Sequence, residues 1–165
     1  MANSPRSLAS SMPNLLTRTR IDHAFAGDVA VATDAYYSPE VADPELVVQG
    51  LLHHQSLERV TMTLLALGAH LLVRLNDVDP LPEHDRGLYV AAIALGHDIE
   101  YFERGAYLID VLLSDMNLPP GPSSDPVGDA TRDLFLLTRL VMGLSMVLSH
   151  RFSNPSQALR DLPLH

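Results

Sequence analysis

Apolar residues recur every three or four positions along most of the chain, which is the period of a helix that buries one face. The three strongest runs predict long helices over residues 43–76, 82–116 and 126–152. A weaker run predicts a helix over residues 21–37, although a short apolar alternation inside it leaves a strand open. These patterns place the chain in the all-α class.

The run over residues 82–116 has the most regular spacing, with apolar residues alternately four and three positions apart. Such spacing is typical of the buried seam of a helical bundle. Gly96 and Gly105 interrupt the run, and they leave room for a kink or for a close contact with another helix.

Three Asp-Pro pairs indicate where the long helices begin. An Asp side chain can accept hydrogen bonds from the free N–H groups of a first turn, and Pro fits the first helical position. The pairs lie at residues 43–44, 79–80 and 125–126, although the second helix could also begin at Pro82. Asn154 and Pro155 predict the start of a short final turn.

Short connections between long helices favour antiparallel neighbours. We therefore expect one domain over residues 21–165, an antiparallel up-down helical bundle of three long helices plus a weaker N-terminal helix. Residues 1–20 are rich in Ser, Asn, Pro and Arg, and we expect them to form a flexible N-terminal arm. The helices carry more apolar surface than three neighbours cover, which predicts a homo-oligomer, most simply a homodimer.

The composition argues against several classes of protein. The 165 residues include no Cys and no Lys, which excludes a thiol nucleophile, a cysteine zinc site and a Schiff-base lysine. A net charge of −9 with scattered arginines argues against nucleic acid as a partner. The longest apolar runs each contain an arginine and are shorter than the ~20 residues of a membrane span. With no secretory pattern at the N-terminus, we expect a cytoplasmic protein.

One group of polar residues has the composition of a metal site. His54 and Glu58 stand four positions apart, and His97 and Glu100 stand three apart, so each pair would share one face of its predicted helix. Antiparallel pairing about a turn near residue 79 would place Glu58 level with Glu100. Imidazole and carboxylate are the ligands that Fe, Mn or Zn would use without cysteine. The candidate metal ligands are His54, Glu58, His97, Asp98 and Glu100.

Two families offer a chemical precedent for such a site. The pair His97-Asp98, after an apolar helical run, resembles the short signature of HD-type metal phosphohydrolases, and this resemblance implies a metal that activates water. The further ligands that it implies are His53 or His54 upstream and Asp129 or Asp133 downstream. Ligands inside a bundle are also similar to those of carboxylate-bridged di-iron proteins, but those carry Glu-x-x-His and this chain has the reverse order.

The same residues also fit a purely structural role. Glu100 and Arg104 are four positions apart and can form a surface ion pair, and histidines among leucines are usually hydrogen-bonded core residues. Our first prediction is therefore a self-associating protein-interaction or assembly module without catalytic activity or cofactor, and the alternative is a metal-dependent enzyme. Tyrosines are the expected interface anchors, because they join a large apolar ring to a polar end. These are Tyr36, Tyr37, Tyr101 and Tyr107.

Overall fold

The computed structural model describes residues 21, 23–37, 49–50, 53, 55–96, 102–115, 130–149 and 155–162. Over these ranges the regular elements are all helices and no strand is present, which confirms the all-α prediction. None of the described helices combines the length and apolar character that crossing a membrane requires. The helices are α2 (His23–Tyr36), α4 (Leu57–Val78), α5 (Arg86–Leu95), α6 (Phe102–Asp115), α7 (Ala130–Leu148) and α8 (Gln157–Arg160).

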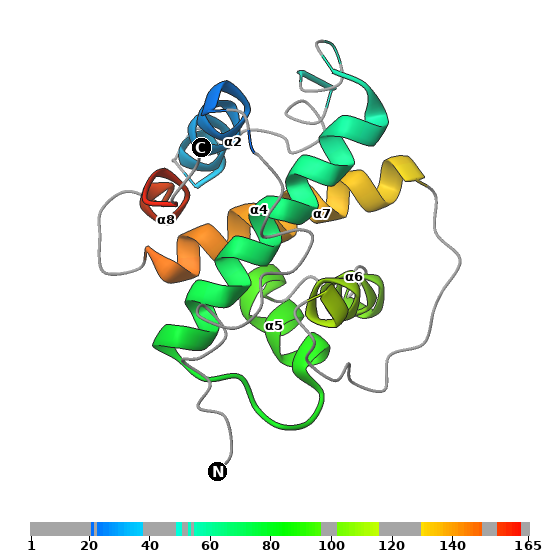
Figure 1. Ribbon diagram of the computed structural model, residues 1–165, viewed down its shortest axis with the longest axis vertical. Coiled ribbons are helices and arrows are strands. Elements are labelled where there is room, and N and C mark those ends of the chain that lie inside the picture. Colours follow the sequence, from blue (N-terminus) through cyan, green and yellow to red (C-terminus); the bar gives the residue numbers. More distant parts are fainter. Residues whose placement is uncertain are drawn as a thin grey trace.

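Helices α4 and α7 cross at the centre of the molecule (Figure 1). Helices α5 and α6 lie on one side of this crossing, and α2 and α8 lie on the other. An up-down arrangement of three long helices is not confirmed. Each fully buried leucine of α4 and α7 stabilises the fold by about 1.5–3 kcal/mol through removal of its side chain from water. Those with no more than 1% exposure are Leu64, Leu67, Leu71, Leu72, Leu134, Leu136, Leu140 and Leu144.

The predicted helix over residues 43–76 is not continuous. Ser56 has extended backbone angles, φ −67° and ψ 154°, and its Oγ accepts a hydrogen bond from the N–H of Arg59 at 3.2 Å. Ser56 is therefore the N-cap of a helix that begins at Leu57, since a capping side chain satisfies a free donor of the first turn. The end of the prediction was close, because α4 ends at Val78.

The predicted helix over residues 82–116 is wrong as a single element. Helix α5 ends at Gly96, whose φ of 64° lies in the left-handed region that glycine adopts readily. Helix α6 then runs back along α5, because Gly105 lies against Leu95 while Asp110 lies against Gly87. The regular apolar spacing therefore does not belong to one continuous helix, and α5 and α6 pack against each other.

Asp79 and Pro80 do not begin a helix as predicted. The N–H of Asp79 donates to the carbonyl of Leu75 at 2.7 Å, so Asp79 ends α4. Its carboxylate accepts a hydrogen bond from the Tyr89 hydroxyl at 3.3 Å and so links the end of α4 to α5. The pKa of Tyr89 is raised above its ordinary value, mainly by partial burial. The negative charge of Asp79 and this hydrogen bond raise it further.

The C-terminal part of the prediction is confirmed more closely. Helix α7 lies within the predicted range 126–152, whose Asp-Pro start falls outside the described residues, and α8 is the predicted short turn. The carboxylate of Asp34 near the end of α2 accepts hydrogen bonds from the N–H and Oγ of Ser156, at 3.1 and 2.9 Å. It also pairs with Arg160 at 3.2 Å, so α8 is fastened to α2.

Candidate functional site: a groove at the beginnings of α4 and α7

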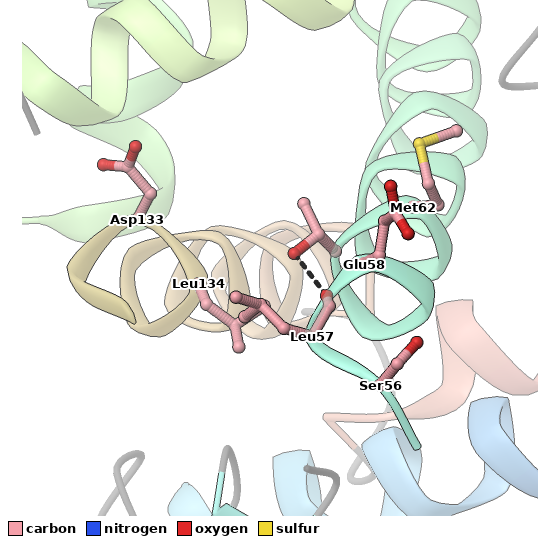
Figure 2. Close-up of a pocket in the computed structure, with 7 residues that line it drawn as sticks. Ser56, Leu57, Glu58, Met62, Asp133 and Leu134 are labelled. Carbon is pink, nitrogen blue, oxygen red and sulfur yellow. Dashed lines mark hydrogen bonds between the residues drawn. The ribbon is translucent and has the colours of Figure 1, made fainter. Parts of the chain in front are cut away.

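An open groove of about 590 Å³ lies between the beginnings of α4 and α7. Figure 2 shows the described lining residues, with Leu57 of α4 beside Leu134 of α7 and with Met62 further along α4. We call it the α4–α7 groove. Its described lining residues are Ser56, Leu57, Glu58, Thr61, Met62, Asp133 and Leu134.

The α4 side of the groove is mainly apolar and open to solvent. Leu57 is 42% exposed and Met62 is 38% exposed, which is high for side chains of this type. The Thr61 hydroxyl donates to the carbonyl of Leu57 at 2.7 Å, the contact dashed in Figure 2. Because this hydroxyl is satisfied within its own helix, Thr61 adds little polar character to the groove.

The α7 side of the groove is held by an ion pair with two hydrogen bonds. Arg104 of α6 donates from Nε to Asp133 Oδ1 at 2.8 Å and from Nη2 to Oδ2 at 2.6 Å. The two side chains are only 18% and 20% exposed, and the guanidinium lies 4.5 Å from the centre of the Tyr107 ring. This planar, two-bonded geometry is the strong form of an Arg–carboxylate contact, and it fixes the first turn of α7 against α6.

Two of the described lining residues of the groove, Glu58 and Asp133, carry carboxylates, and none of the described lining residues is basic. Because Arg104 neutralises Asp133, the remaining negative charge of the described lining is that of Glu58. Both carboxylates lie in the first turn of a helix, where they favour the positive end of the helix dipole. Glu58 is exposed, so a negative charge borders the apolar lining. Such a groove suits an apolar segment that also carries basic residues.

The structure describes one of the five predicted metal ligands, Glu58. His54, His97, Asp98 and Glu100 lie outside the described residues. The premise that His54 and Glu58 share one helix face is wrong, because the helix is interrupted at Ser56 between them. His97 and Glu100 were assumed to lie on one continuous helix with the residues before them. That assumption no longer holds, because α5 ends before His97.

The further metal ligands suggested by the sequence do not have the surroundings expected of residues that share one metal ion. His53 is exposed, Asp133 is paired with Arg104, and Asp129 lies outside the described residues. In the part of the chain that the structure describes, no three His, Asp or Glu side chains are close enough together to hold a metal ion. With four of its ligands outside that part, the metal site stays a prediction.

The predicted interface tyrosines are also only partly described. Tyr37 and Tyr107 are half-buried, and the Tyr107 ring lies beneath Arg104. Tyr36 is the last residue of α2, but its side chain and the whole of Tyr101 lie outside the described residues. Their role at an interface stays a prediction.

Sequence reasoning missed Leu57 and Met62 as groove residues. Their spacing is that of any apolar helical face, so the pattern gives no reason to separate them from the core. One signal of a new helix was present in the sequence. Ser56 is followed by Leu57 and then by the acidic residue Glu58, and a serine with an acidic residue in the first turn is typical of a helix start. A helix that begins there leaves its first apolar residues at an end, where fewer neighbours cover them.

Comparison with known proteins supplies no family, since neither a family model, nor a curated protein, nor a solved structure matches the chain. The function is therefore argued from the groove and the charge of the chain.

The metal hypothesis makes a direct prediction. Protein purified without an affinity tag is expected to contain stoichiometric Fe, Mn or Zn by elemental analysis, and His54→Ala or His97→Ala is expected to lose it. His84→Ala, in an exposed loop, is the matched control and should keep the metal. Absence of metal after supplementation, with unchanged melting temperatures of both ligand variants, would contradict the hypothesis.

Proposed function

We propose that this protein is a helical interaction module that associates with a second copy of itself through the α4–α7 groove. The observation that carries the proposal is the exposure of Leu57 and Met62, two apolar residues that line the α4–α7 groove. Full burial of such a side chain contributes about 1.5–3 kcal/mol, so covering only the exposed part of each contributes roughly 0.5–1 kcal/mol. A dimer would cover them in both copies, so four side chains contribute.

The character of the groove supports a polypeptide occupant. Leu57 and Met62 are exposed at its opening, and grooves that receive a segment of another chain are open in this way. Met62 has a flexible and polarisable side chain, which adapts to an irregular partner surface. Such an association requires no cofactor.

Self-association is tested by multi-angle light scattering over a wide range of protein concentration. The wild-type chain is expected to give twice the monomer mass at high concentration and to dissociate on dilution. Met62→Glu is expected to raise the dissociation constant at least about tenfold, because a charge would enter an apolar contact. Circular dichroism should show that the variant keeps its helical content.

The matched control is Val78→Glu at the other end of α4. Val78 is 71% exposed and does not line the groove, so this variant carries the same added charge but should associate like the wild type. A strict monomer at all concentrations, or equal weakening by Met62→Glu and Val78→Glu, would contradict the proposal.

A further inference from the structure

The first 20 residues of the chain differ in charge from the rest. They contain Arg6, Arg18 and Arg20 and no acidic residue, which gives them a charge of +3. The other eight arginines and all 20 carboxylates leave residues 21–165 with a charge of −12. The beginning of the chain is therefore attracted to the remainder of the molecule, in its own copy or in another.

The same stretch has an apolar pattern that suits a groove. Leu8, Met12 and Leu15 are four and three positions apart, and Leu16 follows directly. Apolar side chains spaced in this way can enter an apolar groove, although Pro13 between them disfavours a regular helix over the whole stretch. Arg18 and Arg20 come next in the sequence, so apolar and basic residues are adjacent.

The groove offers the complementary set of groups. Leu57 and Met62 present exposed apolar surface, and the exposed carboxylate of Glu58 supplies a negative charge, whereas that of Asp133 is paired with Arg104. We propose that residues 8–20 of one copy, which we call the N-terminal segment, dock in the α4–α7 groove of a second copy. This inference rests on the proposed self-association and names the part of the chain that performs it.

The N-terminal segment is attached directly to the core of its own chain. Ile21, the next residue, is 1% exposed and belongs to the hydrophobic core, so the segment is joined directly to the body of its own chain. Each copy has one N-terminal segment and one groove, so reciprocal exchange closes as a two-fold dimer with both grooves filled.

The absence of cysteine makes cross-linking a direct test on the full chain. Met12→Cys and Met62→Cys are prepared as separate proteins, of which the second is uniformly labelled with a heavy nitrogen isotope so that the two differ in mass, and they are mixed at about 0.1 mM with a short bismaleimide. Docking holds the two introduced thiols at an effective concentration of roughly a millimolar, so cross-linking should be about tenfold faster than by free encounter. The control mixture pairs Met12→Cys with Val78→Cys, whose side chain is more exposed than that of Met62.

The charge contribution is tested in the same assay. Adding Arg18→Glu and Arg20→Glu to the Met12→Cys protein is expected to lower the cross-linking rate to that of the control mixture. High salt should slow the reaction of the original pair and leave the control mixture largely unchanged, because ions screen the attraction.

Several outcomes would overturn the inference. Equal rates in the two mixtures, while light scattering shows a dimer, would mean that the protein self-associates without its N-terminal segment in the groove. A third protein carries both Met12→Cys and Met62→Cys in one chain. If the cross-link forms only within this chain and not between the two single variants, the segment covers its own groove. A strict monomer in light scattering would remove the proposed self-association together with the exchange.

Discussion

Gly143→Ala is expected to destabilise the protein by about 3 kcal/mol, despite the higher helix propensity of alanine. Gly143 lies in α7 where α5 crosses it, and a Cβ there would overlap with the carbonyl oxygen of Ala94. Because the obstacle is backbone and not the end of a flexible side chain, the two helices would have to move apart. Urea denaturation followed by circular dichroism measures the loss.

Gly27→Ala in α2 is the matched control for this substitution. No atom lies within 4 Å of a Cβ built at Gly27, so only the gain in helix propensity remains. This variant is expected to be more stable than the wild type by about 0.5–1 kcal/mol. If Gly143→Ala were stabilising to the same degree, the close crossing of α5 and α7 would be incorrect.

Asp110→Ala is expected to destabilise the protein by about 2 kcal/mol. Asp110 is a carboxylate with only 5% exposure, and it lies on α6 against Gly87 in the first turn of α5. That turn receives no side-chain hydrogen bond from its own N-cap residue, Asp85. The carboxylate of Asp110 therefore stabilises the positive end of α5 from the neighbouring helix.

Two further variants separate this effect from a general loss of packing. Asp110→Asn keeps the shape and one oxygen but loses the charge, so about half of the destabilisation is expected. Asp85→Asn should change the free energy of unfolding by less than about 0.5 kcal/mol, because Asp85 is exposed and Asn tolerates its left-handed φ of 55°. An effect of Asp110→Ala as small as that of Asp85→Asn would contradict the role of Asp110.

The candidate site was harder to predict than the fold. The His and Glu pairs were chosen by spacing along helices that were assumed to be unbroken, but Ser56 interrupts the first helix between His54 and Glu58, and α5 ends before His97. A single serine or glycine changes which side chains share a face, because it ends the 3.6-residue repeat on which the spacing depends. Asp133 was considered as a metal ligand, but in the structure it pairs with Arg104. The two residues are 29 positions apart in the sequence, so no local sequence pattern predicts their contact.

The sequence by itself determined the helical class, the approximate place of α7 and the charge difference between the first 20 residues and the rest. These follow from periodicity and composition, which are local properties. The tertiary structure alone decided where α4 begins, that α5 and α6 fold back on one another, and that α4 and α7 enclose a groove. These depend on which apolar faces meet, and the same period-3.6 pattern permits several pairings until whole helices pack against one another.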